Sequence, residues 1–386
     1  MRWTIATLFS LTLVFAITSC KKEGTAGQGD EILIGEYASM TGATATFGIS
    51  SHEGTLMAIE DANAAGGLHG KKIKLISEDD RSDQNEASTA VQKLISRDKV
   101  CAVLGEVASK RSFAGANICQ KEKIPMLSPA STNTGVTQFG DYIFRICFTD
   151  DFQGMVGAQF AIKKGWKRVA VFTDVANDYS KGLAKSFKDV YPKGGGQIAS
   201  EESYREGDND FKAQLTKMKG ANVEAVFLPG YYTDVGKILR QARELGLNIP
   251  FFGGDGWDDP QTYINLSSIA NGCYFTNHYS ADDKRPEVQD FIRKYGERYK
   301  NADGSPKIPD AMAILGYDSA RVLLDAIKRA GSADPKAIRD ALAATKDFPG
   351  ASGTITIDEN RNAKKPIVIV ELKDGRMTMA DALAPE

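Results

Sequence analysis

The sequence predicts an α/β protein of two doubly wound lobes, each a parallel sheet covered by helices, joined by a hinge. Two observations support this prediction. Short runs rich in β-branched residues alternate with longer runs whose apolar residues recur at helical spacing. This alternation passes through two successive series along the chain. Strands separated by helices of about 10–15 residues pair in parallel through right-handed crossovers, so each series builds one lobe.

The first series runs from residue 32 to residue 128. The segment 51–65 has Leu56, Ile59 and Ala62 at helical spacing and stops at a pair of glycines. The run 100–104 is apolar throughout, as in strands that are buried on both faces of a parallel sheet. The predicted strands are 32–37, 72–78, 100–104 and 125–128, and the predicted helices are 51–65, 84–97 and 112–120.

The second series follows the same pattern and is succeeded by a more helical region. Its predicted strands are 168–173, 197–204, 223–228 and 249–253, and its helices are 150–165, 180–190, 210–219 and 235–245. Three further helices, 286–300, 311–330 and 335–344, and two closing strands, 353–357 and 366–372, complete the chain.

The chain length suits two domains of ordinary size. We expect residues 31–148 with 279–356 to form the first lobe, and residues 149–278 with 357–386 to form the second. The chain then passes between the lobes about three times, near residues 148–149, 277–278 and 357–358. Three such strand crossings would make the hinge.

The first thirty residues predict export. A basic start precedes an apolar run over 3–17, which is too short and too often interrupted by Thr and Ser to span a bilayer. This layout is typical of a secretory signal peptide over residues 1–19. The segment Ile17-Thr18-Ser19-Cys20 resembles the lipobox of bacterial lipoproteins. That resemblance implies an acylated Cys20, a flexible tether over 20–30, and a protein held at the periplasmic or extracellular face of a membrane only by its lipid. An ordinary signal peptide with an incidental Cys is the alternative.

Composition excludes several classes of protein. The 42% hydrophobic and 25% charged residues are typical of a soluble globular body. A net charge of −2 gives no basic surface for nucleic acid. The three histidines, His52, His69 and His278, have no metal-ligand spacing. We therefore expect no metal, no cofactor and no nucleic-acid partner.

Four cysteines follow Cys20, at positions 101, 119, 147 and 273, and none forms a C-x-x-C pair. Cys101 begins a predicted strand and Cys119 ends the helix after it, which places both at one edge of the sheet. A Cys101–Cys119 disulfide is one hypothesis. Plain buried thiols are the alternative.

Polar residues follow the strands of both series. In an open α/β sheet the ligand lies beyond the carboxyl ends of the strands, and with two lobes that position is the cleft between them. Ser109 and Thr132 each offer a hydroxyl and a backbone N–H, which suit a carboxylate near helix N-termini. Asp255 lies between glycines in the second series and is suited to an ammonium group. Each signal alone is equally typical of a helix cap or a turn, but together they predict a site for a small zwitterion.

Several motifs carry a family resemblance from about residue 32 to residue 374. The most specific are the turn N-A-A-G-G-L-H-G at 63–70 and the helix L-R-Q-A-R-E-L-G at 239–246, with S-P-A-S-T at 128–132. In combination they make the chain similar to the branched-chain amino-acid (leucine/isoleucine/valine) type of substrate-binding protein of ABC transporters. The resemblance implies a type I periplasmic binding protein fold.

The resemblance also implies roles for individual residues. Ser109 and Thr132 match the hydroxyl residues that hold the ligand α-carboxylate, and Asp255 stands where the family commonly has a Glu for the ammonium group. Ala130 matches a residue whose backbone contacts the ligand amino group, and Ser131 lies between Ala130 and Thr132 in the sequence. Tyr179 and Tyr231 match the second-lobe aromatics that close over the ligand; Tyr37, Phe47 and Trp257 are candidate walls for its side chain, with core packing as their alternative.

Other functions are less consistent with the sequence. No G-x-S-x-G, H-E-x-x-H or P-loop motif occurs, so we expect no enzyme. A sensor of an amide, urea or small carboxylate on the same fold is the alternative function; it would need a following membrane helix or signalling domain, which we do not expect. We expect a monomer that binds a branched-chain or other hydrophobic amino acid by hinge closure and delivers it to ABC transporter permease subunits.

Overall fold

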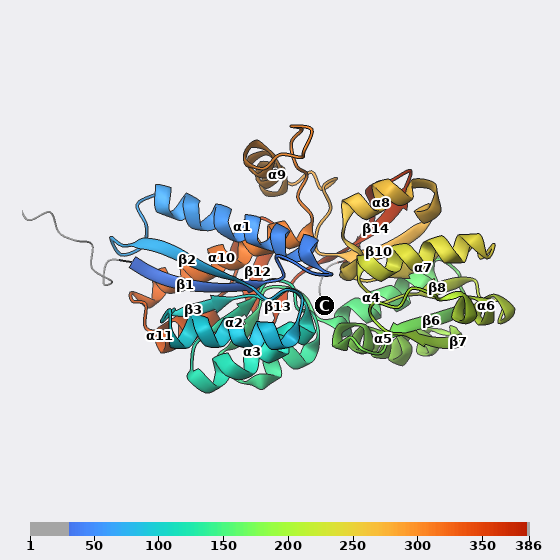
Figure 1. Ribbon diagram of the computed structural model, residues 1–386, viewed down its shortest axis with the longest axis horizontal. Coiled ribbons are helices and arrows are strands. Elements are labelled where there is room, and N and C mark those ends of the chain that lie inside the picture. The colour runs from blue at the N-terminus through green and yellow to red at the C-terminus, as the bar shows by residue number, and fades with distance from the viewer. Residues whose placement is uncertain (1–30, 384–386) are drawn as a thin grey trace, which may run out of the picture.

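The computed structural model describes residues 31–383 and arranges them as two lobes side by side (Figure 1). The first lobe contains a five-stranded sheet in the order β2-β1-β3-β4-β5. All its neighbouring strands are parallel, with Ile34 of β1 opposite Leu75 of β2 and Ala102 of β3. This order is that of a doubly wound sheet. The strands are β1 (Glu31–Ala38), β2 (Lys72–Asp79), β3 (Ala102–Leu104), β4 (Met126–Ser128) and β5 (Ile143–Arg145).

Helices cover both faces of this sheet. Two of them, α1 and α10, cross at very short distance because each has a glycine at the contact. A Cβ on Gly54 would lie 1.9 Å from the Ala313 carbonyl oxygen, and one on Gly316 would lie 2.2 Å from that of Ser51. The first-lobe helices are α1 (Ala45–Ala64), α2 (Gln84–Ser96), α3 (Ser109–Glu122), α9 (Pro286–Arg298), α10 (Ala311–Ala330) and α11 (Pro335–Ala343).

The second lobe contains a seven-stranded sheet in the order β15-β14-β10-β9-β8-β6-β7. Its members from β7 to β10 are parallel, whereas β14 and β15 add an antiparallel edge. The strands are β6 (Arg168–Asp174), β7 (Gln197–Tyr204), β8 (Ala225–Phe227), β9 (Phe251–Gly253), β10 (Cys273–Asn277), β14 (Ile367–Lys373) and β15 (Arg376–Leu383). The helices are α4 (Asp150–Lys163), α5 (Asp178–Val190), α6 (Lys212–Gly220), α7 (Tyr232–Glu244) and α8 (Pro260–Leu266).

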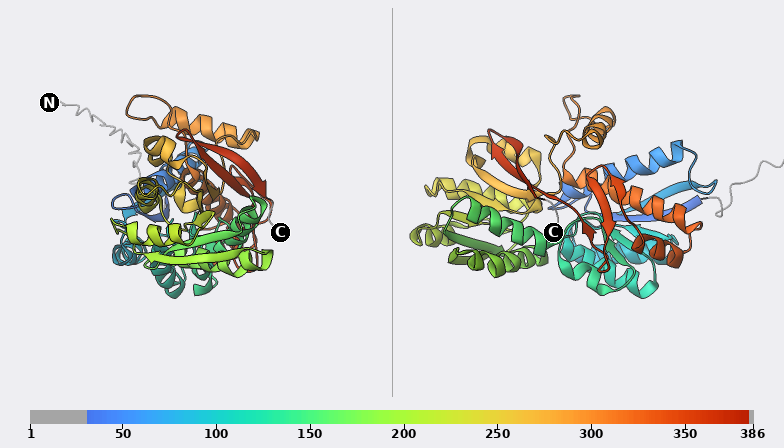
Figure 2. Two further views of the ribbon diagram at one scale, coloured as in Figure 1. Left: turned by 90° about the vertical axis from the view of Figure 1, so that its right-hand side faces the viewer. Right: turned by 180° about the vertical axis from the view of Figure 1, so that it is seen from behind.

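The chain passes between the two large sheets at three places, which lie together between the lobes (Figure 2). The first passage joins β5 to α4, and the second leaves β10 toward α9. The third lies between β13 (Ala363–Lys364) and β14, later than the predicted position at 357–358. The reason is that β13 pairs back onto β12 (Gly353–Ile357), which also pairs with β11 (Phe348–Gly350). The Arg145 N–H donates to the Arg361 carbonyl at 3.1 Å, which ties this small sheet to the first lobe.

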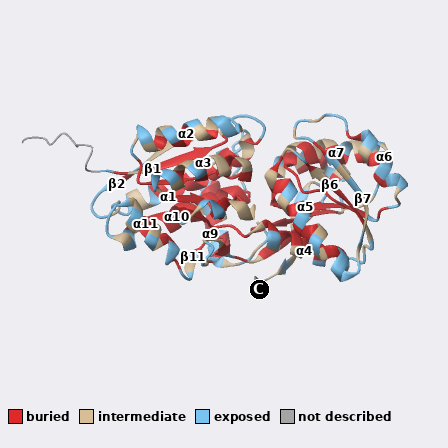
Figure 3. Cartoon of the chain, turned by 90° about the horizontal axis from the view of Figure 1, so that it is seen from below, coloured by how far each residue is buried: buried red, intermediate tan, exposed pale blue. Residues whose placement is uncertain are grey.

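The predicted two-lobe α/β fold is confirmed, and the structure adds to the two large sheets three strands that were not predicted: β10 inside the second sheet, and β5 and β15 at sheet edges. Buried residues follow the strands and the inner helix faces, while exposed residues lie on the outer helix faces and in loops (Figure 3). Within residues 31–383, no helix combines the length and apolar character that a bilayer crossing needs. The predicted signal peptide, the tether and Cys20 lie outside the described residues.

The cysteine hypothesis is wrong in this structure. Cys101, Cys119, Cys147 and Cys273 are all buried and free. Cys101 belongs to the core cluster on one face of the first sheet, and Cys119 belongs to the cluster under α2 and α3. A helix that returns to the sheet edge therefore does not bring these two thiols together, because they point into different parts of the core.

Candidate functional site

The two lobes meet through the amino-terminal ends of their helices. The Tyr232 hydroxyl at the start of α7 donates to the Ala43 carbonyl, just before α1, at 3.3 Å. The Asn133 side-chain amide donates across the interface to the Asp178 carbonyl at 2.8 Å. Phe47 of α1 packs edge-on against the Tyr231 ring, with centroids 5.8 Å apart. The structure therefore holds the lobes in a closed arrangement.

A small cavity of about 10 Å³ lies at this interface, which is room for about one water molecule. All the residues that line it are buried. They come from both lobes: Phe47, Val107, Ser109, Ala130, Thr132 and Met312 from the first, and Tyr179, Tyr231, Asp255 and Gly256 from the second. Most of the residues that the sequence singled out are thus brought together.

The first-lobe wall of the cavity offers hydrogen-bond donors. Ser109 is the first residue of α3, after β3, and Thr132 follows β4, so parallel strand ends bring the two side by side. The Ser109 hydroxyl accepts a hydrogen bond from the Asn133 N–H at 3.2 Å, which holds the two segments together. The α3 amino terminus adds unpaired N–H groups and the positive end of the helix dipole. This wall is suited to a carboxylate.

The second-lobe wall is acidic at one point. Asp255 begins η3 (Asp255–Trp257), directly after β9, and only 3% of its surface is exposed. The Gln153 side chain fixes it twice: Oε1 accepts from the Asp255 N–H at 2.7 Å, and Nε2 donates to Oδ1 at 3.0 Å. His278 Nε2 lies 3.0 Å from the other carboxylate oxygen. A carboxylate has about four lone-pair sites, so acceptor capacity remains for an ammonium group.

A second carboxylate lies near the same point. Asp150 begins α4 and is buried, and its backbone N–H donates to the Thr132 carbonyl at 2.9 Å. Burial above all, with the nearby Asp255 charge adding to it, raises the pKa of Asp150 well above its usual value, although the nearby Thr132 side chain acts in the opposite sense. Burial at this position therefore favours the neutral form of the Asp150 carboxyl group over its charged form.

Two tyrosines form the second-lobe lid of the cavity. The Tyr179 and Tyr231 rings are stacked with centroids 5.3 Å apart and planes within 3°. The Tyr179 hydroxyl accepts a hydrogen bond from the Gly256 N–H at 3.1 Å. Burial raises the pKa of both phenols well above the usual value, so both stay neutral. They cover the cavity with flat aromatic surface and add no charge.

Three predicted site residues do not line the cavity. Ser131 directs its hydroxyl to the carbonyls of Glu106 and Val107, both at 2.9 Å, and so supports the loop that carries Ser109. The Tyr37 ring lies in the core under α2 and α3. The Trp257 indole is fully buried in the second-lobe core, where its N–H donates to the Leu228 carbonyl at 2.9 Å. For Tyr37 and Trp257 the structure agrees with the alternative of core packing.

Several residues of this region were not singled out from the sequence. Val107 lies in the segment after β3, where the post-strand rule could have found it. Met312 comes from the start of α10, which is distant in the sequence, and no local sequence pattern predicts that it lines the cavity. Gln153 and His278 reach Asp255 from α4 and from the end of β10, and only the fold brings them there.

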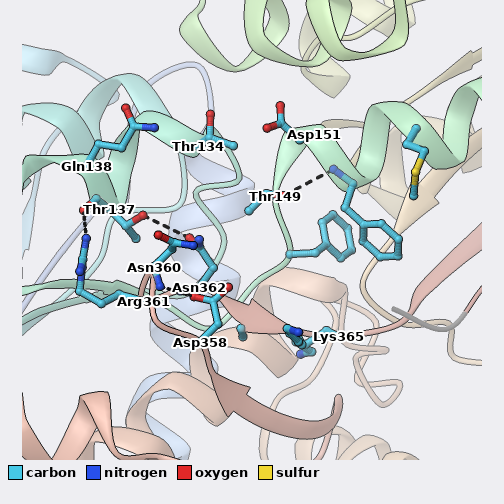
Figure 4. Close-up of a pocket in the computed structure, with 15 residues that line it drawn as sticks. Thr134, Thr137, Gln138, Thr149, Asp151, Asp358, Asn360, Arg361, Asn362 and Lys365 are labelled. Atoms are coloured by element: carbon cyan, nitrogen blue, oxygen red, sulfur yellow. Dashed lines mark hydrogen bonds between the residues drawn. The ribbon is translucent and has the colours of Figure 1, made fainter. Parts of the chain in front are cut away.

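A much larger cavity, about 610 Å³, lies elsewhere, beside the hinge segments (Figure 4). It is lined by polar groups that mostly bind one another. The Arg361 guanidinium donates to the Thr137 carbonyl at 3.0 Å, and the Asp358 carboxylate accepts backbone N–H groups of its own loop. Phe148 lines this cavity and also stacks on His278, so the two rings separate it from Asp255. No group of three or more metal-ligating side chains is found among residues 31–383.

Comparisons with known proteins agree with the geometry. Residues 31–376 match a family described as periplasmic binding protein. A Leu/Ile/Val-binding protein homolog of Brucella melitensis is 31% identical over 90% of this chain and 93% of its own. The structure is similar to that of a leucine-binding protein from Thermotoga maritima, with TM-score 0.86, 40% identity, and coverage of 92% of this chain and 99% of that chain. It is equally similar (TM-score 0.86, 34% identity, covering 92% and 100%) to a branched-chain amino acid transporter substrate-binding protein from Streptococcus pneumoniae in complex with isoleucine.

Proposed function

The chain belongs to the periplasmic binding protein family, and on that premise we propose that it captures a small hydrophobic amino acid outside the cytoplasm and delivers it to an ABC importer. One observation carries the proposal: the interlobe cavity has hydrogen-bond donors on its first-lobe wall and a carboxylate on its second-lobe wall. This is the complement of a zwitterion. The relatives named for leucine, isoleucine and valine support the same ligand class.

The remaining walls favour an apolar ligand side chain. Phe47, Val107 and Met312 are buried hydrophobic residues of the first lobe, and among the described residues that line the cavity Asp255 alone is of a charged type. A charged ligand side chain would lose its hydration there without gaining a partner. Leucine, isoleucine and valine avoid that loss.

Hinge closure is the mechanism we propose. The ligand carboxylate binds Ser109 and Thr132 in the first lobe, and its ammonium group binds Asp255 in the second, so the ligand contacts both lobes only when they are closed. A ligand with this differential affinity shifts the population toward the closed form. The permease then recognises the closed form. In this proposal the protein is a monomeric lipoprotein held by Cys20, and it performs no catalysis.

A thermal-shift screen of the twenty amino acids, followed by calorimetry, tests the proposal, because a ligand that binds only the native state raises Tm. The best ligand is then compared with its des-amino analogue on the natural protein and on Asp255→Ala. We expect the natural protein to prefer the amino acid strongly, and the variant to have lost most of that preference. Equal discrimination by both proteins would exclude Asp255 from the site and favour the alternative of a simple carboxylate or amide ligand.

A further inference from the structure

One buried side chain connects the hinge directly to the acidic wall of the cavity. His278 is the first residue after β10, at the second passage between the lobes, and its side chain is fully buried. Its Nε2 lies 3.0 Å from Oδ2 of Asp255. Its ring is stacked on Phe148, with centroids 3.8 Å apart and planes within 19°. Phe148 belongs to the first passage between the lobes, so His278 contacts two hinge segments and the site at once.

The chemistry of this contact fixes the state of the imidazole. An ionised carboxylate can only accept hydrogen bonds, so Nε2 of His278 carries the ring proton and its N–H donates a hydrogen bond to Asp255. Nδ1 has no hydrogen-bond partner among the described residues. Burial lowers the pKa of His278, and the hydrogen bond to Asp255 only partly opposes this effect. The ring is therefore neutral at physiological pH, and it orients Asp255 without neutralising its charge.

The two partners of Asp255 have different origins. Gln153 lies within the second lobe, on α4, and is itself held by the Thr276 hydroxyl at 2.7 Å. It moves with Asp255 as one body. His278 lies at the second passage between the lobes, and its ring is stacked on Phe148 from the first passage. Only His278 makes the orientation of Asp255 depend on the hinge.

We propose that His278 is a positioning residue for amino-acid recognition: its Nε2–H holds the Asp255 carboxylate toward the ligand ammonium group, and its stack on Phe148 makes that orientation depend on hinge closure. The inference rests on the proposed function, because it assigns to Asp255 the role of ammonium acceptor. It predicts that discrimination between an amino acid and its des-amino analogue depends on a residue that does not line the cavity.

Two substitutions separate the hydrogen bond from the stack. His278→Phe keeps an aromatic ring on Phe148 and removes the N–H donor. His278→Gln keeps an N–H donor at a similar reach and removes the ring. His69→Phe is a matched control, because the His69 ring is hydrogen-bonded to the Ile327 carbonyl within the first lobe, away from Asp255. Melting curves of all variants establish that each one is folded.

The readout is the ratio of affinities for the amino acid and its des-amino analogue, measured by calorimetry. A hydrogen bond to a charged group contributes strongly to binding free energy. We therefore expect His278→Phe to lower this ratio about tenfold or more. We expect His278→Gln to keep the ratio within about threefold of the natural value, and His69→Phe to leave it unchanged. An unchanged ratio in His278→Phe, or an equal loss in both His278 variants, would overturn the proposal.

A second measurement needs no ligand and separates failure of this inference from failure of the proposed function. With only three histidines in the chain, the imidazole ¹⁵N resonances can be assigned from His→Phe variants. We expect His278 to be the neutral Nε2–H tautomer and its resonances to change in Asp255→Ala. If no amino acid binds but this result is obtained, only the proposed function fails. A charged imidazole or an Nδ1–H tautomer at neutral pH would overturn the positioning role itself.

Discussion

The Asp258 carboxylate of the second lobe accepts a hydrogen bond from the backbone N–H of Ala311, the first residue of α10 in the first lobe, at 2.6 Å. The Asp310 carboxylate caps the same helix end by accepting from the Ala313 N–H at 2.9 Å. Two buried carboxylates, one from each lobe, thus share one helix amino terminus. Burial first, and then the Asp310 charge, raise the pKa of Asp258 to about 8. The contact between the lobes therefore holds a proton near neutral pH.

The first prediction concerns stability against pH. Between the ordinary carboxyl pKa, about 4, and the raised value of about 8, the folded protein binds a proton that the unfolded chain has released. Its contribution to the free energy of unfolding is complete below about pH 4 and is lost as the pH rises through about 8. Asp258→Asn keeps an oxygen for the Ala311 N–H but has no proton to lose. Urea titrations at several pH values in this range should show that the free energy of unfolding falls further in the natural protein than in Asp258→Asn. We expect the difference to be about 1 kcal/mol or more.

The control for this prediction is Asp334→Asn at the start of α11, where an exposed carboxylate caps a helix that packs against α10 of the same lobe. That variant should keep the slope of the natural protein. A natural protein whose stability rises across this window would show that the buried pair is ionised in the folded state.

The second prediction tests the first-lobe wall of the site. Ser109→Ala and Thr132→Val each remove a hydroxyl that we place on the ligand carboxylate, and each should weaken amino-acid binding about ten- to a hundredfold. Both should weaken the des-amino analogue by the same factor, because it keeps the carboxylate. Calorimetry on the two ligands decides. A loss seen only with the amino acid would place these hydroxyls on the ammonium group. Thr89→Val, on the exposed face of α2, is the control.

The third prediction separates packing from recognition at Trp257. The indole donates to the Leu228 carbonyl and packs against Tyr263 and Phe275. Trp257→Phe should destabilise the protein by about 1–3 kcal/mol, through a lost hydrogen bond and a cavity in the core. Its affinity for the ligand should change by less than about threefold. Denaturant titration and calorimetry on one preparation test both statements. A large loss of affinity at unchanged stability would return Trp257 to the ligand wall.

The fourth prediction concerns the thiols. Burial raises the pKa of Cys101 and of Cys147 to about 12, which leaves almost no reactive thiolate at neutral pH. A soluble form that starts after Cys20 should show no reaction with a thiol reagent while folded, and complete reaction of all its cysteines in denaturant. Fewer reactive thiols in denaturant, restored by a reductant, would reveal a disulfide.

The fifth prediction concerns anchoring. In cells, Cys20→Ala should move the protein from the membrane fraction to the soluble extracytoplasmic fraction, because the acyl chains that hold it are absent. Mass spectrometry of the natural protein should detect the lipid on the mature amino terminus. Retention of the variant in the membrane with an unchanged mature mass would contradict the lipobox.

The alternation of strands and helices was enough to predict both lobes, because parallel strands buried on two faces have a strong apolar signal. The strand β10, in the middle of the second sheet, was not predicted, and neither were several short or edge elements. β5 has only three residues, and β15 has no buried residue, so its sequence lacks the apolar pattern of a buried strand. The third lobe crossing was misplaced because the pairing of β13 with β12 depends on residues that carry no signal of their own.

The candidate site was predictable where it obeys the rule for strand ends, as at Ser109, Thr132 and Asp255. It was not predictable where a shift of one or two residues along a turn decides whether a side chain points into the cavity or into the core. Trp257 is only two residues after Asp255, but the tight turn of η3 directs its indole into the core. Met312 and His278 reach the site region through packing between distant segments, and no spacing in the sequence contains that information.

The burial of every residue around the interlobe cavity has a kinetic consequence. Because both lobes supply these buried residues, we expect a ligand bound between them to leave when the lobes part, so that the rate of opening sets its residence time. Strengthening one contact lengthens the residence time only as far as it slows that parting. A membrane partner that separates the lobes would then release the ligand in a single step. It would not need to bind the residues that hold the ligand.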